Sequence, residues 1–377
     1  MPNEKLTKKN VNYKPYIKHY NNNYNNTKHI YIIIQAGFGN KVFDLMCAIY
    51  LYNLYNNTYQ KCIINCILMK SHHDNINDPK LDAIFPQSKY KINFINSIHF
   101  NNLKNNRSIK LNHIELDSNS KLLAILDKFP KYENLLNHNI IDNVSNYHGL
   151  MYEIYKSFSK KDKDIFINFN KNILTDKNII NNIISEPYSL IHVRYGDKLY
   201  YLSQYINKPN LDINIIQNET RPKSSCIDQF LLYTPEYYID KINELLKTTN
   251  ENMKIYIITD SSNIVRQFIM NNNTIKNNSR IVFLDKMTWW DSFYLFYYAS
   301  NIILSDSTFA LAGSYFNQKN ANCKIVIYHH NEDSDNISPK EYASDPYWKI
   351  TNERKYILNY NPKIAYMIIK YKYFWTD

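Results

Sequence analysis

The sequence predicts an α/β fold built on parallel, doubly wound β-sheet, and three observations predict it. Short apolar, β-branched segments alternate with helix-like segments through the second half of the chain, and a strand, a glycine turn and a helix open the first half. Strands that alternate with helices pair in parallel, because each helix returns the chain to the edge where the next strand begins. With 377 residues and 44% hydrophobic content, the chain can bury the cores of two domains of ordinary size.

A polar, basic tail comes before the first predicted strand. Residues 1–28 contain no apolar segment of the kind found in signal peptides. Residues 29–35 form an apolar run typical of a buried strand, and a turn at Gly37 and Gly39 leads to a helix over residues 42–55. Residues 62–69 predict the next strand. From residue 71 to residue 146 the apolar patches are short and Asn-rich segments separate them, so the pattern predicts no definite order of elements.

The second half alternates more regularly. Pro235 suits the first turn of a helix that Thr234 can cap. The longest apolar stretch, residues 287–304, contains Asp291 and Asn301, so it is explained better as a core helix and strand than as a membrane span. The predicted strands are 188–193, 254–258, 280–284, 301–304 and 323–327. The predicted helices are 235–246, 261–270, 289–299 and 308–316, with a closing helix in the Tyr-rich residues 355–377.

Composition and charge exclude several classes of protein. A formal net charge of +11 attracts phosphate groups, but Lys is dispersed, and a chain rich in Asn, Ile, Lys and Tyr fits the codon drift of an A+T-rich genome. No nucleic-acid-binding motif is present, so no nucleic-acid partner is expected. The five cysteines are sparse and odd in number, which predicts reduced thiols, and no Cys or His pairs have the spacing of a metal site. We therefore expect a soluble, cytoplasmic protein without a membrane anchor or a metal.

Glycine occurs only 5 times, so its placement is informative. Four glycines lie where predicted strands, loops and helices join: Gly37, Gly39, Gly196 and Gly313. Glycine is favoured where φ is positive or where the backbone approaches a ligand closely. The pattern therefore predicts ligand-facing backbone at three places: residues 37–40, 194–197 and 305–313. At the first place a tight turn without a ligand is an equal alternative, since a Gly-x-Gly pair after a strand is weakly specific.

The second place carries the strongest signal. The period of two along a strand puts His192 and Arg194 on one face of the strand that ends there. A guanidinium at the carboxyl end of a strand, beside a turn glycine, suits bidentate phosphate binding, and Arg is rare in this chain. The alternative is a structural ion pair between Arg194 and Asp197. At the third place, hydroxyls and free amides at a helix start form an anion site, or Ser307 simply caps that helix.

Five segments, taken in order, resemble motifs of the α-1,2-fucosyltransferases of glycosyltransferase family 11. Residues 37–40 and the helix after them are similar to the Gly-Gly-x-Gly-Asn-Gln-Met-Phe start of that family, and residues 192–197 to its His-x-Arg-Arg-Gly-Asp motif. Residues 257–260 resemble its Phe-Ser-Asp-Asp strand end and residues 291–296 its Asp-Leu-x-Leu-Met helix. Residues 305–313 resemble its Asn-Ser-Thr-Phe-Ser-Trp-Trp-Gly block. The order and spacing fit over residues 30–328.

The resemblance implies a GT-B-like fold, in which two Rossmann-like domains face each other across a cleft. It implies transfer of L-fucose from GDP-fucose to a galactoside-type glycan acceptor, with inversion and without a metal or other cofactor. The expected organisation is a polar tail at 1–28, an acceptor-side domain at 29–185, a nucleotide-sugar-binding domain at 186–330 and a closing segment at 331–377. The partners would be the nucleotide sugar and the glycan. The acceptor sugar, the linkage and the oligomeric state are not predicted.

The resemblance also implies roles for individual residues. Arg194 would hold the β-phosphate and stabilise negative charge as GDP leaves, which makes it the expected catalytic residue. Asn40 would face the sugar and the acceptor from the opposite domain. Asp44 and Asp197 are both candidates for the general base, and a dissociative path in which the leaving phosphate takes the proton needs neither. The other expected donor-binding residues are His192 and Asp260 near the guanosine, Ser307 and Thr308 at the diphosphate, and Gly37 and Gly39.

The sequence departs from the family motifs at five positions, and two alternatives stay open. Lys41 replaces Gln, Tyr195 replaces the second Arg, Ser261 replaces the second Asp, and Leu311–Ala312 replace the paired Trp. The missing Arg keeps open a donor that carries another 6-deoxyhexose, such as rhamnose linked to UDP or dTDP. The net charge and the 35 Tyr residues keep open a non-enzymatic protein that binds nucleic acid or glycan.

Overall fold

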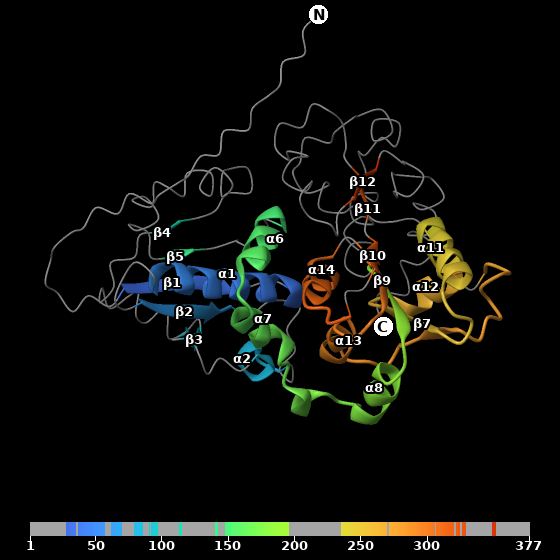
Figure 1. Ribbon diagram of the computed structural model, residues 1–377, viewed down its shortest axis with the longest axis horizontal. Helices are drawn as coiled ribbons and strands as arrows, with labels where there is room; N and C mark the ends of the chain where they lie inside the picture. The colour runs from blue at the N-terminus through green and yellow to red at the C-terminus, as the bar shows by residue number, and fades with distance from the viewer. Residues whose placement is uncertain are drawn as a thin grey trace, which may run out of the picture.

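The part of the chain that the structure describes contains two five-stranded parallel sheets and one pair of short parallel strands (Figure 1). The computed structural model describes residues 28–34, 37–56, 62–69, 79–85, 90, 92–96, 113–114, 140–141, 148–195, 235–269, 271–305, 307–319, 322–324, 326–328 and 349–351. The predicted tail, most of residues 71–146 and the predicted closing helix at 355–377 lie outside these residues.

The N-terminal domain carries the first sheet, whose strand order is β3-β2-β1-β5-β4. Its strands are β1 (Lys28–Ile34), β2 (Cys62–Leu68), β3 (Ile92–Asn96), β4 (His113–Ile114) and β5 (Ile140–Ile141). Every neighbouring pair is parallel, with Ile32 opposite Cys66 in the β1–β2 pair. Ile32 and Ile34 face the main core, whereas Tyr31 and Ile33 belong to a small cluster of their own. The alternation follows from the period of two along a strand.

The C-terminal domain carries the second sheet, whose strand order is β10-β9-β6-β7-β8. Its strands are β6 (Tyr188–Val193), β7 (Lys254–Thr259), β8 (Ile281–Phe283), β9 (Asn301–Ile303) and β10 (Asn322–Lys324). Numbered along the chain within the domain, the order is the 3-2-1-4-5 of a Rossmann sheet. All six residues of β6 are buried, as expected for the central strand of a sheet covered on both faces.

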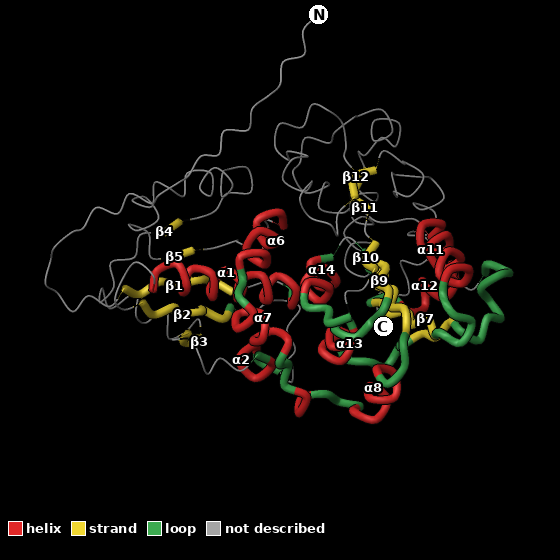
Figure 2. Tube along the Cα trace, viewed as in Figure 1, coloured by secondary structure: helices red, strands yellow, loops and turns green. Residues whose placement is uncertain are grey.

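The helices follow the strands as the alternation predicts, and Figure 2 shows them around both sheets. They are α1 (Phe38–Asn56), α2 (Leu81–Ile84), α6 (His148–Ser157), α7 (Lys160–Ile167), α8 (Lys177–Ile184), α11 (Pro235–Thr248), α12 (Ser262–Ile269), α13 (Trp289–Leu295) and α14 (Thr308–Tyr315). Side chains define several of their starts. Ser159 and Asp162 form a capping box at α7, and Thr288 accepts a hydrogen bond from the amide of Asp291 at α13.

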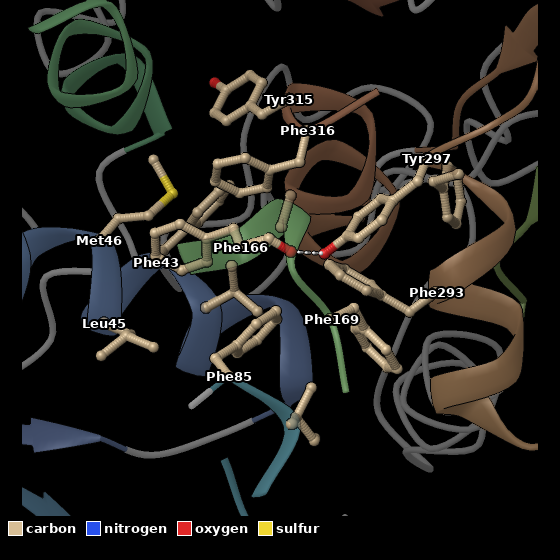
Figure 3. Packing of buried hydrophobic residues seen from close by; sticks show 14 of the residues in the cluster. Phe43, Leu45, Met46, Phe85, Phe166, Phe169, Phe293, Tyr297, Tyr315 and Phe316 are labelled. Carbon is tan, nitrogen blue, oxygen red and sulfur yellow. Dashed lines mark hydrogen bonds between the residues drawn. The ribbon is translucent and has the colours of Figure 1, made fainter. Parts of the chain in front are cut away.

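One hydrophobic core runs through both domains. It joins residues of α1 and α7 to residues of α13 and α14, and Figure 3 shows Phe43, Phe166 and Phe316 gathered in it. The rings of Phe166 and Phe316 stack with centroids 4.5 Å apart, and the hydroxyl of Tyr297 donates to the carbonyl of Phe166 at 2.7 Å. A second core lies between the C-terminal sheet and helices α11 and α12. The two domains are therefore packed through shared apolar side chains.

Helices α1 and α14 form the central contact between the domains. Phe38 lies near Phe309, with ring centroids 6.3 Å apart, and Phe43 lies near Tyr315 at 5.8 Å. Residues early in α1 thus meet residues early in α14, and later residues meet later ones. The two helices run in the same sense along their contact, and their N-terminal ends lie together.

The architecture confirms the predicted fold class, an α/β protein with two Rossmann-like domains in a GT-B-like arrangement, and it corrects three boundaries. Helix α1 begins at Phe38, so Gly39 and Asn40 lie in its first turn and not in a separate turn before it. The helix predicted over residues 289–299 ends at Leu295. The strand predicted over residues 323–327 is two short strands in different sheets, β10 and β11 (Val326–Tyr328), and β11 pairs with β12 (Lys349–Thr351).

Candidate functional site

The strand order of the C-terminal sheet defines where a ligand is expected. Strand β6 lies between β7 and β9, and the chain proceeds in opposite directions across the sheet from β6. In open parallel sheets, ligands bind at this switch point, outside the carboxyl ends of the strands. Arg194 follows β6, Asp260 follows β7 and Ser305 lies shortly after β9, so the topology brings these three residues to one edge.

Arg194 forms an ion pair with Asp260 at this edge. Its Nε lies 3.2 Å from Oδ2 of Asp260, and the two side chains are 27% and 29% exposed. The other carboxylate oxygen of Asp260 accepts a hydrogen bond from the amide of Tyr195 at 3.0 Å, which fixes Asp260 against the end of β6. A partly exposed pair contributes about 0–1 kcal/mol to stability, so an anionic ligand can compete for the guanidinium. Asp197, the partner considered from the sequence, lies outside the described residues, as does Gly196.

His192 lies below this edge. Its ring is 5% exposed, its Nδ1 lies 2.5 Å from Oγ of Ser305, and it packs against Phe309 with centroids 5.5 Å apart. The sequence placed His192 and Arg194 on one face of the strand, near a nucleoside and a phosphate respectively. In the structure His192 is a buried support for the segment that leads from β9 to α14, whereas Asp260 remains partly exposed at the edge.

The start of α14 adjoins the same edge. Ser307 is the N-cap residue, but its side chain makes no capping hydrogen bond, so the simple capping role considered for it is not what its hydroxyl does. The Ser307 carbonyl accepts from the amide of Leu311 at 3.0 Å. The first amides of a helix point outward at the positive end of its dipole, which suits an anion. Ser307 and Thr308 are half-buried.

Helix α1 of the N-terminal domain lies directly against the start of α14. A Cβ built on Gly39 would lie 2.2 Å from the amide nitrogen of Phe309 and 2.3 Å from the carbonyl carbon of Thr308. A Cβ on Gly37 would meet nothing within 4 Å. Neither glycine has a left-handed φ, so of these two predicted ligand-facing glycines, Gly39 is required by contact with the protein's own backbone. Asn40 follows in the same helical turn and is half-buried.

Aromatic residues that the sequence analysis did not single out complete this contact. The ring of Phe38 lies 4.3 Å from Trp289, 4.8 Å from Phe293 and 6.3 Å from Phe309, measured between centroids. Phe309 also contacts His192, so one ring connects β6 to α1 through α14. The sequence feature that could have identified Phe38 and Phe309 is their position inside the two predicted motifs at residues 37–40 and 305–313.

Asp44 is not at this edge. It is 1% exposed on α1, and its charge acts on two buried thiols of the N-terminal domain. Burial and then the charge of Asp44 raise the pKa of Cys47, and the same causes raise the pKa of Cys66. Both cysteines are free thiols. This placement counts against Asp44 as the general base.

Tyr195 occupies the position at which the family motif has its second Arg. It is 2% exposed and its ring lies 6.0 Å from that of Tyr238 in the core under α11. Burial, with a smaller contribution from Glu236, raises the pKa of Tyr195 well above its ordinary value. The second motif position is therefore part of the apolar core in this chain and carries no charge to the edge.

Within the ranges the structure describes, no three or more His, Cys, Asp and Glu residues come together as metal ligands would. In the same ranges, no helix combines the length and apolar character needed to cross a membrane.

The fold and the edge define a class: a two-domain Rossmann-like α/β protein whose switch point carries an arginine. Similar solved structures are glycosyltransferases. The fucosyltransferase NodZ from Bradyrhizobium is 13% identical, covers 76% of this chain and 92% of its own, and gives a TM-score of 0.41. POFUT1 in complex with GDP is 10% identical over 77% and 95%, with a TM-score of 0.37. The E. coli ADP-heptose LPS heptosyltransferase II is 10% identical over 91% and 98%, with a TM-score of 0.40.

Comparisons of sequence alone add no assignment. No protein-family model matches the chain, and a search of curated proteins finds no relative. The resemblance to glycosyltransferase family 11 therefore stays a prediction. Because the structural similarities are this distant, the role of each residue has to be argued from the site itself.

Proposed function

We propose that this protein is a glycosyltransferase that transfers L-fucose from GDP-fucose to a galactoside-type glycan. The observation that carries the proposal is the position of Arg194. Its guanidinium follows the central strand of a Rossmann sheet at the switch point, is partly exposed, and is held by Asp260 near the end of β7. Nucleotide diphosphates bind at this position in Rossmann folds, and guanidinium is the side-chain group best suited to them.

Donor binding follows from the charges at the edge. The diphosphate takes over part of the contact that the Arg194 guanidinium makes with the carboxylate of Asp260. Breaking this contact costs little free energy because the ion pair is partly exposed. The first-turn amides of α14, with the hydroxyls of Ser307 and Thr308, provide further donors to phosphate oxygens. Asp260 then accepts hydrogen bonds from the nucleoside while it still holds the amide of Tyr195.

The transfer is an inverting displacement at the anomeric carbon of the sugar. The acceptor hydroxyl attacks this carbon, the bond from it to the β-phosphate oxygen breaks, and GDP leaves with the electron pair. Arg194 stabilises the charge that develops on the phosphate, an effect of about 10²–10³ in rate. The acceptor proton passes to a carboxylate such as Asp197 or to the departing phosphate. Asn40, in the turn of α1 that lies against α14, would contact the sugar and the acceptor.

The choice of GDP and fucose rests on the five ordered motifs that resemble family 11. One observation favours a second candidate, a transferase for another 6-deoxyhexose such as rhamnose. The family's second motif Arg is replaced by Tyr195, which is buried in the core and leaves one fewer positive charge for the donor. We rank this candidate second because Arg194, Asp260 and the start of α14 need no second arginine to bind a diphosphate.

Incubation of the protein with GDP-fucose and a panel of galactosides, with EDTA present, tests the proposed activity. We expect release of GDP and a fucosylated product whose mass and linkage can be measured. Wild-type protein without acceptor is the control for hydrolysis of the donor. No release of nucleotide from any GDP-, UDP- or dTDP-linked deoxysugar would contradict the proposal.

Thermal unfolding in the presence of different nucleotides separates the candidates. A ligand that binds only the folded state raises the melting temperature, and the rise grows with the logarithm of the ratio of its concentration to its Kd. Stabilisation by GDP alone supports fucose as the donor sugar, whereas stabilisation by UDP or dTDP supports the second candidate. No stabilisation by any nucleotide, with tight and salt-sensitive binding of single-stranded DNA, would support the non-enzymatic alternative.

A further inference from the structure

At Gly39 the two domains approach each other too closely to admit a side chain. Its hypothetical Cβ would lie 2.2 Å from the amide nitrogen of Phe309 and 2.5 Å from the carbonyl oxygen of Thr308. Real Cβ atoms essentially never lie closer than 3.0 Å to such atoms. The atoms in contact belong to the backbone of α14, which cannot turn away as a side chain can. Any residue other than glycine at position 39 therefore forces α1 and α14 apart.

The surroundings leave little freedom for a small local adjustment. Phe38 is fixed by the rings of Trp289 and Phe293 on α13, at 4.3 and 4.8 Å between centroids. Phe309 is fixed on the other side by His192, at 5.5 Å. Packed aromatic side chains transmit displacement rather than absorb it. A side chain at position 39 therefore moves the start of α14 as a unit with respect to α1.

We propose that Gly39 is a positioning residue that sets the spacing between the two parts of the donor site. The expected effect of Gly39 on activity rests on the proposed function, whereas its expected effect on the position of α14 does not. Ser307 and Thr308 lie at the start of α14, and Asn40 follows Gly39 on α1. Their separation is fixed by the backbone contact at Gly39. Separating them weakens donor binding and, more strongly, the alignment needed for transfer.

Substitutions at two glycines of the same segment test the inference. Gly39→Ala and the larger Gly39→Val are compared with Gly37→Ala, whose Cβ would meet nothing within 4 Å. We expect Gly39→Ala to raise the Kd for GDP about tenfold and to lower kcat about 10²-fold, because a misplacement of about 1 Å in a reacting geometry has effects of this size. Gly39→Val should have larger effects on both constants. Gly37→Ala is the control for structure alone, because its Cβ leaves the spacing between α1 and α14 unchanged.

A second measurement is independent of activity. In crystal structures superposed on the N-terminal sheet, Gly39→Ala should show the start of α14 displaced from α1, and Gly37→Ala should not. If the wild type binds no nucleotide but α14 is displaced in Gly39→Ala, the proposed function fails and the spacing role survives. If α14 stays in place, or if Gly39→Ala binds GDP and turns over like the wild type, the inference is wrong.

A further variant keeps the test decisive if Gly39→Ala does not fold. Phe38→Leu leaves Gly39 in place but removes the ring that fixes α1 against α13 and α14. We expect it to fold, to raise the donor KM severalfold and to lower kcat more than it raises the acceptor KM. A folded Phe38→Leu variant with unchanged kinetic constants and an unchanged GDP affinity would overturn the inference.

Discussion

Arg194 and Asp260 form the ion pair on which the proposed donor site depends. Both side chains are partly exposed, so the pair contributes little to folding, yet it orients the guanidinium at the end of β6. Asp260 is itself held by the amide of Tyr195 at 3.0 Å. In the proposed function, a diphosphate would find the positive charge already in position and would not have to order a flexible side chain. Preorganisation of this kind is a main source of stabilisation in the transition state.

Substitution of Arg194 should reduce transfer far more than it reduces stability. We expect Arg194→Ala to lower kcat/KM for the donor by about 10²–10³, and Arg194→Lys to recover part of this loss because it keeps the charge but not the bidentate geometry. Initial-rate kinetics with varied donor give both values. Arg266→Ala is the matched control, since Arg266 pairs with Asp285 at the same edge of the sheet. Equal losses in the two alanine variants would contradict the role assigned to Arg194.

Asp162, on α7, ties that helix to α1 and to Tyr90, which precedes β3. It is 5% exposed and accepts hydrogen bonds from Asn53 at 2.9 Å, from Tyr90 at 2.5 Å and from Ser159 at 2.6 Å. Burial alone would raise the pKa of Asp162, but the hydrogen bonds from Ser159, Tyr90 and Asn53 outweigh it and hold the pKa below its ordinary value. The charged carboxylate is therefore the form that stabilises the folded state.

The linkage gives this stabilisation a definite pH dependence. A lowered pKa in the folded state contributes stability that is complete above the ordinary value of 3.8 and is lost as the pH falls through the lowered pKa. At neutral pH, Asp162→Asn should lower the free energy of unfolding by about 2 kcal/mol, and the difference from wild type should shrink below pH 3.8. Urea unfolding across pH measures both. Asp164→Asn, on the same helix, is the control, and a difference from wild type that does not depend on pH would contradict the account.

The sequence pointed to some of these residues and not to others, for physical reasons. Arg194 and Asp260 follow strands, and the carboxyl ends of neighbouring parallel strands must share an edge, so their proximity could be predicted. The burial of His192 could not, because it depends on how Phe309 and Ser305 pack over the strand. The burial of Asp44 likewise depends on which face of α1 lies on the sheet. The apolar residues next to Asp44 in the sequence do not identify that face.

At the scale of elements, α14 is the helix on which the domains meet. It packs against α1 through Phe309 and Tyr315 and against α13 through Gly313. A Cβ on Gly313 would lie 2.7 Å from the Phe296 ring, so the two helices approach closely only with glycine there. The sequence marked Gly313 as informative, but what it meets is a side chain of the core and not a ligand.

Gly313→Ala should therefore destabilise the protein. The Phe296 ring is fully buried and has little room to move, so we expect a loss of about 1–3 kcal/mol in the free energy of unfolding, as for other overpacked cores. Chemical denaturation measures it, with Gly37→Ala as the control because its Cβ has open space. A Gly313→Ala variant as stable as the wild type would show that Phe296 can shift at no cost.

The elements themselves were predicted best where strands and helices alternate without interruption. The strand at 188–193 and the starts of the helices at 235, 289 and 308 were confirmed at the residues expected. Strands β4 and β5 are only two residues long each, which is too short for any periodic pattern. The division of residues 323–327 between two sheets could not be foreseen, because an apolar run does not say which sheet each part joins.

At the scale of the whole molecule, one hydrophobic core joins the two Rossmann-like domains. Phe43 and Phe166 of the N-terminal domain pack with Tyr315 at the end of α14 and with Phe316, the residue that follows it (Figure 3). Such a contact holds the first turn of α1 against the start of α14, which lies beside the switch point of the C-terminal sheet. Residues from both domains therefore lie close to the switch point of the C-terminal sheet.

A crystal structure of the protein with GDP shows whether Arg194 binds the diphosphate. We predict a diphosphate oxygen within about 3 Å of the Arg194 guanidinium, beside the start of α14 and facing the first turn of α1. GDP bound at another part of the surface, with the Arg194–Asp260 pair unchanged, would contradict it.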